Sequence, residues 1–128
     1  MVNDAIADFL VQLKNASKVR KGTVSVPYSR VTHAIAEVLA REGYVGEVAR
    51  RTKTRKIDVA LRYEDGRPRI SGGTRISKPS RRVYLGARDI RPVKRGRGLL
   101  ILSTPKGIKT GKEAREERIG GEVLFELW

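Results

Sequence analysis

The C-terminal part of the chain contains two apolar segments joined by polar and turn-forming residues. Residues 99–102 are apolar at every position, which is typical of a strand buried in the middle of a sheet. Residues 122–128 form a second candidate strand. Between them lie a small polar loop, residues 103–107, and a short helix that Thr110 and Glu113 are expected to cap. This order predicts a stiff β scaffold that holds a polar loop at the end of a strand.

The N-terminal part predicts a small α+β unit. Apolar residues at helical spacing indicate a first helix, and Ser29 is a candidate N-cap for a second helix that ends at Gly43. Alternating apolar residues indicate three strands. The predicted elements are helix 3–16, strand 23–26, helix 30–42 with a buried stripe of Val31, Ile35, Val38 and Leu39, strand 44–48, a polar hairpin loop 50–55 and strand 56–63.

A turn signal at Asp65-Gly66, followed by Pro68, marks the predicted domain boundary. Short strands are expected over residues 69–77 and 82–85, and the capped helix from Gly111 to near Ile119. The predicted fold class is α+β, with two small packed α+β domains. Residues 1–65 form an α-β-α-β-β domain, and residues 66–128 form a mostly β domain with one short helix.

Positive charge is the bulk property that restricts partners. The chain has 28 Lys and Arg against 14 Asp and Glu, a net charge of +14. Residues 67–97 hold eleven of the basic residues and one acid, Asp89. A solvated basic surface that only aids solubility is the alternative, but the concentration of charge favours binding to a polyanion.

The composition disfavours an enzyme. No cysteine is present, so disulfides and thiolate metal sites are excluded, and a reducing cytoplasmic location is compatible. His33 is the one imidazole, and no acidic pair has the spacing of a known metal loop. The start of the chain resembles neither a signal peptide nor a membrane span. We therefore expect no catalytic site, metal, cofactor or membrane contact.

The loop at residues 103–107 carries the chemistry needed to read RNA. Ser103 and Thr104 supply hydroxyls, Gly107 frees a backbone amide and Lys106 supplies an ammonium, next to Pro105. Such groups suit the wide, shallow groove of an RNA helix, which displays sugar hydroxyls and base edges. The alternative is an ordinary connection made of turn-forming residues. The surrounding basic residues favour RNA, with phosphate contacts expected from Lys78, Arg81 and Arg82.

Two other residues are candidates for specific contacts. Tyr84 could stack on a base or ribose, or it could be a core residue of a strand. Glu122 would be repelled by RNA unless it accepts hydrogen bonds, for instance from a base amino group. It follows Gly120 and Gly121, which allow close backbone approach. Glu122 is therefore a candidate for discrimination between RNAs.

Several motifs resemble the eighth small-subunit ribosomal protein of the bacterial type. Residues 103–107 are similar to that family's S-T-S-K-G, residues 110–115 to T-x-x-x-A-R, and residues 120–122 match G-G-E. Residues 4–8 resemble D-P-I-A-D, and residues 14–16 resemble R-N-A. Residues 75–79 and 82–84 match R-x-S-K-P and R-x-Y, so the resemblance extends over essentially the whole chain.

The resemblance implies two packed α+β domains and a structural role in the small ribosomal subunit. The family binds a stem with an irregular internal loop in the central domain of small-subunit ribosomal RNA and helps the subunit to assemble. It implies a main site at Ser103, Thr104, Lys106 and Gly107 with Tyr84 and Glu122, and a second RNA contact at Lys14, Asn15 and Ser29. It also implies a neighbouring protein, the fifth of the small subunit.

An alternative role uses the same surface, because the family's RNA site can be mimicked by the messenger RNA of its own operon. The chain would then act as a translational repressor. One departure from the family bears on either role: Pro105 stands where serine is usual, which removes a hydroxyl and a backbone donor and pushes Thr104 toward an extended conformation.

Overall fold

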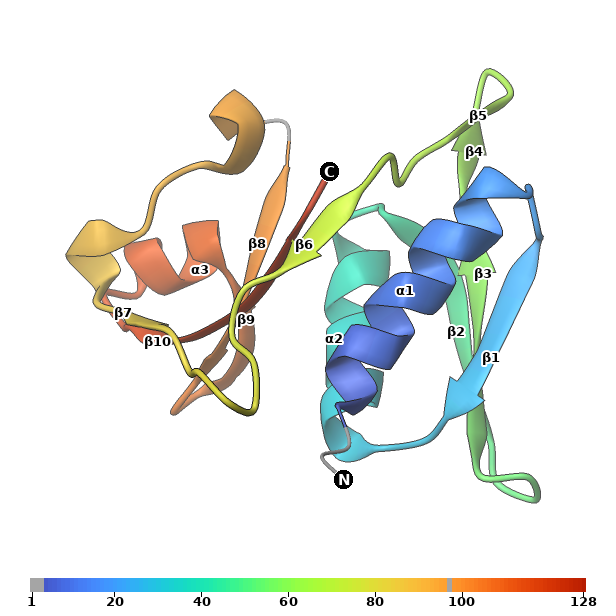
Figure 1. Cartoon of the computed structure of the whole chain (residues 1–128), viewed down its shortest axis with the longest axis horizontal. Coiled ribbons are helices and arrows are strands. Elements are labelled where there is room, and N and C mark those ends of the chain that lie inside the picture. Colours follow the sequence, from blue (N-terminus) through green and yellow to red (C-terminus); the bar gives the residue numbers. More distant parts are fainter. Residues whose placement is uncertain (1–3, 97) are drawn as a thin grey trace. The chain divides into compact units, whose positions relative to one another are not determined.

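The computed structural model describes residues 4–96 and 98–128, and the chain divides into two compact units. The first unit is Ala5–Ser71 and the second is Gly72–Trp128 together with Asp4. Both contain helices and antiparallel strands (Figure 1), which confirms the α+β class. The Asp65-Gly66 turn lies inside the first unit, where residues with φ of 51° and 76° close a small hairpin.

The first unit follows the predicted order of helix, strand, helix, strand and strand. Its strands form an antiparallel sheet in the order β1-β3-β2. The hairpin that ends the unit pairs β4 with β5. The elements are α1 (Ala5–Lys18), β1 (Thr23–Pro27), α2 (Arg30–Arg41), β2 (Val45–Arg51), β3 (Lys56–Leu61), β4 (Tyr63–Glu64) and β5 (Arg67–Pro68). Asn3, the predicted start of the first helix, lies outside the described residues.

Both helices cover one face of this sheet (Figure 1), and the buried Val24, Val26, Ile57 and Val59 of the strands lie on that face. The sequence placed Val31 in the buried stripe of α2, and this was wrong: Val31 is 44% exposed. The Ser29 hydroxyl accepts the Thr32 amide at 3.0 Å and fixes where α2 begins. Counting from there, Thr32, Ile35 and Leu39 lie on one face at helical spacing, and all three are buried.

The second unit is built on an antiparallel sheet in the order β6-β10-β8-β9, with the short β7 also paired to β10. The elements are β6 (Gly73–Arg75), β7 (Tyr84–Leu85), η1 (Ala87–Asp89), η2 (Val93–Gly96), β8 (Leu99–Thr104), β9 (Gly107–Thr110), α3 (Gly111–Glu116) and β10 (Gly121–Leu127). The apolar segment at residues 99–102 is flanked by partners on both sides, as predicted for a central strand.

The core of the second unit lies between α3 and one face of the sheet. Leu102 and Val123 face each other across β8 and β10, and both pack with Ala114 of α3. The capping box of α3 is confirmed, because the Thr110 hydroxyl accepts the Glu113 amide and the Glu113 carboxylate accepts the Thr110 amide. These contacts fix α3 directly after β9.

Three predictions for the second unit were wrong. Strand β9 was missed, so the polar loop is the turn of a hairpin rather than a connection to the helix. The strand expected over residues 69–77 is a regular strand only at Gly73–Arg75, although backbone hydrogen bonds to β10 and Trp128 continue at Gly72, Ile76 and Ser77. Helix α3 ends at Glu116, before Ile119, because Arg118 adopts a left-handed φ of 57° and ends the helical path.

Candidate nucleic-acid interface

Tyr84, Glu122 and Ser103 lie directly opposite one another on three adjacent strands, β7, β10 and β8. We call these three residues the cross-strand row. Opposite residues of a sheet point to the same face, and two strand spacings separate Tyr84 from Ser103 by about 10 Å. The neighbouring pair, Val123 and Leu102, points to the other face and is buried. The register therefore collects an aromatic ring, a carboxylate and a hydroxyl on one face.

The polar loop predicted from sequence is a tight turn at one end of this row. Thr104 faces Gly107 across the hairpin, with Pro105 and Lys106 exposed between them. The Thr104 hydroxyl donates to the Gly107 carbonyl at 2.8 Å and accepts the Lys106 amide at 3.1 Å. Gly107 has a φ of 105°, which favours glycine. The turn is therefore held by Thr104, while the half-buried Ser103 makes no side-chain hydrogen bond to another described residue.

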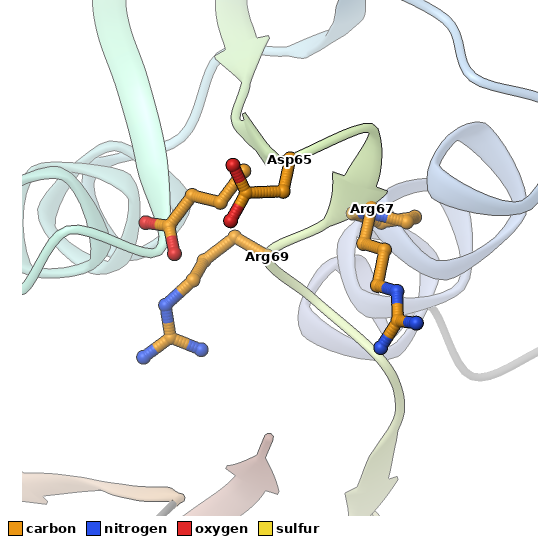
Figure 2. A pocket seen from close by; sticks show the side chains of 5 residues that line it. Asp65, Arg67 and Arg69 are labelled. Atoms are coloured by element: carbon orange, nitrogen blue, oxygen red, sulfur yellow. The ribbon is translucent and has the colours of Figure 1, made fainter.

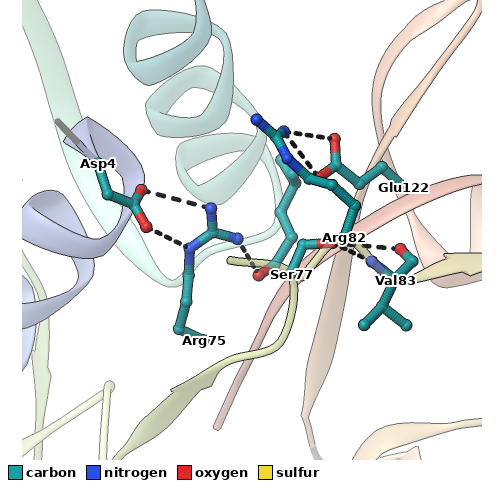
Figure 3. Close-up of polar contacts among 7 residues, drawn as sticks. Asp4, Arg75, Ser77, Arg82, Val83 and Glu122 are labelled. Atoms are coloured by element: carbon teal, nitrogen blue, oxygen red, sulfur yellow. Dashed lines mark hydrogen bonds and ion pairs between the residues drawn. The ribbon is translucent and has the colours of Figure 1, made fainter. Parts of the chain in front are cut away.

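A second turn, which we call the basic turn, comprises residues 78–82 and precedes β7. Lys78 and Arg81 exchange two backbone hydrogen bonds, of 2.8 and 2.9 Å. The buried Ser77 hydroxyl accepts the Val83 amide at 2.7 Å and donates to the Val83 carbonyl at 3.2 Å (Figure 3). All five residues of the turn are exposed. Ser77 thus fixes the base of a turn whose cations face solvent, a role that sequence reasoning missed although the matched motif contains it.

Glu122 has a partner in the free protein. Arg82 Nη1 lies 3.1 Å from one carboxylate oxygen and 3.4 Å from the other (Figure 3). The Glu122 side chain is only 14% exposed, whereas that of Arg82 is 54% exposed. The Glu122 carboxylate, whose charge is balanced by Arg82, thus lies between Tyr84 and Ser103. Glu122 can therefore sit beside an anionic ligand at reduced electrostatic cost.

Tyr84 is 67% exposed, which excludes the core alternative left open by the sequence. The other tyrosines are engaged within the protein. Arg50 lies 3.8 Å from the ring centroid of Tyr28, Arg69 lies 3.9 Å from that of Tyr44, and the Tyr63 hydroxyl donates to the Lys21 carbonyl. Tyr84 is thus the tyrosine whose ring is presented to solvent.

Gly120 and Gly121 allow β10 to fit between its neighbours. A Cβ on Gly121 would lie 2.3 Å from the Ser103 carbonyl oxygen, and one on Gly120 would lie 2.4 Å from the Leu85 carbonyl oxygen. Both distances are shorter than any that real Cβ atoms show. The glycine pair is therefore needed for the close approach of the strands that carry the cross-strand row.

The residues expected to contact a second RNA segment lie in the first unit. Lys14 is half-buried and Asn15 is exposed, both on α1. The Ser29 hydroxyl is used in capping α2: besides accepting the Thr32 amide, it donates to Thr32 Oγ1 at 2.8 Å. Their role in RNA binding stays a prediction.

The other polar groups in the part of the chain that the structure describes lie apart from one another. His33 Nε2 lies 3.2 Å from Glu37, four residues further along α2. Among the described residues, no group of three or more His, Asp or Glu could hold a metal ion. No helix in residues 4–96 and 98–128 is long and apolar enough to cross a membrane.

A shallow depression lies beside the β4–β5 hairpin. Its lining side chains point in different directions, as Figure 2 shows for Arg67 and Arg69. The residues that line it are Glu64, Asp65, Arg67, Pro68 and Arg69. Two acids are followed by two arginines, and the arginine side chains diverge (Figure 2), so the depression offers no defined ligand geometry.

Comparison with known proteins gives a consistent result. The family model described as Ribosomal protein S8 matches residues 4–128. A small ribosomal subunit protein uS8 from Nitratidesulfovibrio vulgaris (strain DSM 19637 / Miyazaki F) is 45% identical over 128 residues, covering 100% of both chains. The protein of the same name from Persephonella marina is 43% identical over 136 residues with 100% of both chains covered. That of Dechloromonas aromatica is 47% identical over 125 residues, covering 96% of this chain and 95% of the relative.

Proposed function

Because the chain belongs to the ribosomal protein S8 family, we propose that it is a structural constituent of the small ribosomal subunit that binds ribosomal RNA directly and helps the subunit to assemble. The observation that carries the proposal is the cross-strand row, which lies between the basic turn and the turn that joins β8 to β9. Its target is a stem with an irregular internal loop in the central domain of the RNA. The second unit provides the main site, and the first unit adds contacts to RNA and to a neighbouring protein, the fifth small-subunit protein.

Each part of the site has a distinct task. The Tyr84 ring stacks on an unpaired base or a ribose, which an irregular stem exposes and a perfect duplex does not. The Ser103 hydroxyl hydrogen-bonds to a base edge or sugar hydroxyl, and Glu122 accepts from a base amino group. Lys78, Arg81 and Lys106 contact phosphates. We expect a preference of roughly 4 kcal/mol or more for the irregular stem over a perfect duplex.

Substitutions in the cross-strand row test this assignment. Ser103→Ala and Glu122→Gln should weaken binding to the irregular stem and leave binding to a perfect duplex of equal length unchanged or slightly stronger, since Glu122→Gln releases the charge of Arg82. Ser71→Ala and Glu126→Gln are matched controls, because Ser71 is exposed outside the row and Glu126 faces Leu100 further along the sheet. If both row variants still prefer the irregular stem over the duplex as strongly as the unsubstituted protein does, the assignment of the cross-strand row as the RNA site is wrong.

Tyr84 and the basic turn give two further readouts. Tyr84→Ala should cost about 1 to 3 kcal/mol in binding to the irregular stem, while Tyr84→Phe keeps the ring and the affinity. Lys78→Ala or Arg81→Ala should weaken both RNAs alike and lower the salt slope by about 0.7 to 0.9 for each phosphate that is no longer neutralised. Equal affinity of the two tyrosine variants would contradict the stacking role.

A messenger RNA with the same folded shape would bind the same surface. The geometry of the site does not favour one source of RNA over the other, so repression of the operon stays a prediction. Competition between the ribosomal stem and leader fragments of the messenger would test it, and comparable affinities would support dual use.

A further inference from the structure

We propose that the uncovered face of the first unit's sheet, at the end closed by the β2–β3 hairpin, is a second RNA-binding surface that holds the phosphates of a duplex without reading its bases. The proposal deepens the proposed function, because it rests on ribosomal RNA being the partner. It places the second contact at residues other than Lys14, Asn15 and Ser29, in a segment that the sequence indicated only as a polar hairpin loop.

The charge of this hairpin is concentrated and largely uncompensated. Residues 50–56 include five basic residues and no acid, and all of them are exposed. Arg51 is ion-paired with Asp58 on the same strand pair. The other four make no ion pair with a carboxylate among the described residues, although the charge of Lys56 also acts on Asp58: Arg50, Lys53, Arg55 and Lys56. Arg50 is opposite the buried Ile57 in the sheet and stacks on Tyr28, so it belongs to the helix-covered face, and the cations left for a ligand are Lys53, Arg55 and Lys56. Three such cations on one hairpin attract a polyanion and release its counterions on binding.

The hairpin is held in a defined shape. Strands β2 and β3 are paired up to Arg51 and Lys56, so only residues 52–55 form the turn. The carbonyl of Arg55, a residue with a left-handed φ of 54°, accepts the Tyr28 amide at 2.9 Å, which ties the turn to the segment after β1. The Arg50 guanidinium lies 3.8 Å from the centroid of the Tyr28 ring. Fixing cations before binding lowers the entropy cost of ordering them on a ligand.

The sheet face next to these cations is not covered by a helix (Figure 1). Helices α1 and α2 cover the opposite face (Figure 1). Across the uncovered face, the register aligns Ser25, Asp58 and Ala49, with Thr23 opposite Ala60 further along. These side chains are small, apart from the carboxylate already paired with Arg51. A protein partner would need apolar side chains on this face. The backbone of an RNA duplex needs cations and no bulky side chain in its way, so the chemistry of the face favours RNA.

This face differs from the main site because it has no side chain that could recognise a base. No aromatic side chain lies on the uncovered face of the described sheet residues, and Tyr28 is already stacked with Arg50. Contacts to phosphates position a protein but carry no sequence information. The surface should therefore bind perfect and irregular stems equally.

The test compares two triple variants of the full-length protein that lose the same charge. Lys53→Ala, Arg55→Ala and Lys56→Ala together remove the hairpin cations. Lys18→Ala, Lys21→Ala and Arg67→Ala remove three exposed cations from other parts of the same unit. Binding to a perfect RNA duplex is measured against salt. The hairpin variant should lower the salt slope by about 2 to 3 and weaken binding at 0.1 M salt by roughly tenfold or more, with little change in the control.

Two outcomes would overturn the inference. One is an equal loss in both triple variants, which would mean that only net charge matters. The other is trypsin cleavage after Lys53 and Arg55 that proceeds at the same rate with saturating duplex as without it, since a bound backbone should protect these bonds. The preference for the irregular stem over the duplex is read separately. Its absence in the unsubstituted protein refutes the cross-strand row and does not bear on this surface, whereas a salt slope that the hairpin variant lowers no more than the control refutes this surface alone.

Discussion

Replacing Ser77 by alanine should destabilise the protein far more than its small size suggests. The side chain is fully buried, and its hydroxyl makes both hydrogen bonds that join it to the Val83 backbone. The Val83 carbonyl keeps a partner after the substitution, because it also accepts the Val123 amide at 2.8 Å. The Val83 amide loses the partner that it has in the structure. The cost is therefore that of one unpaired N–H group inside the protein.

Leaving such a group unpaired costs about 1 to 3 kcal/mol, compared with about 1 kcal/mol for a hydrogen bond that water can replace. The loss falls at the base of the basic turn, so it should also loosen the position of Lys78 and Arg81. We expect the free energy of unfolding in urea to fall by about 1 to 3 kcal/mol, and exchange of the Val83 amide with solvent to accelerate more than that of amides in β8.

Ser80→Ala is the matched control, because Ser80 lies in the same turn and is exposed. It should change the free energy of unfolding by less than about 0.5 kcal/mol. If Ser77→Ala and Ser80→Ala are equally stable, or if the Val83 amide exchanges at an unchanged rate in Ser77→Ala, the reasoning about this hydroxyl is wrong.

Three further predictions concern the scaffold. Gly121→Ala puts a Cβ 2.3 Å from a carbonyl oxygen of β8 and should cost about 1 to 3 kcal/mol in urea unfolding, whereas Gly22→Ala meets no atom within 4 Å and should not. Thr110→Ala removes the α3 cap and should cost about 1 kcal/mol in the same assay. Hydrogen bonds, chiefly from Arg51, hold the pKa of Asp58 below its ordinary value of 3.8, so this carboxylate stabilises the fold above that pH and the benefit is lost as pH falls below it. A titration of stability against pH should therefore fall less steeply in acid for Asp58→Asn.

Most helices and strands could be predicted because their signals are local. Ser29 and Thr110 are capping residues within one turn of the amides that they accept, and the apolar residues 99–102 require burial wherever the strand lies. Strand β9 could not be predicted in the same way. Ile108 is its one apolar residue of large size, and β9 is a strand because it pairs with β8. The residues next to β9 in the sequence favour a turn, and pairing with β8 makes this segment a strand.

The residues of the candidate site were chosen from the sequence, but their arrangement could not be predicted from it. Tyr84, Glu122 and Ser103 are separated along the chain by other elements, and only the register of β10 with β7 and β8 aligns them. The exposure of Tyr84 follows from the same pairing, since a two-residue strand at the sheet edge leaves its ring uncovered. Register depends on pairing between distant segments, which the pattern within one segment does not specify.

Pro105 shows how the scaffold accommodates a proline at the position where the resemblance implies serine. Thr104 ends β8 in the extended conformation that a following proline favours. The amide that Pro105 lacks is not needed by the turn, because the turn is closed by the Thr104 hydroxyl with the Lys106 amide and the Gly107 carbonyl. These bonds occupy the hydroxyl of Thr104. A serine at position 105 would have supplied a second hydroxyl in the turn. In the proposed site, hydroxyl recognition would therefore fall mainly to Ser103, so Ser103→Ala should cost this protein more discrimination between RNAs than it costs a Pro105→Ser variant.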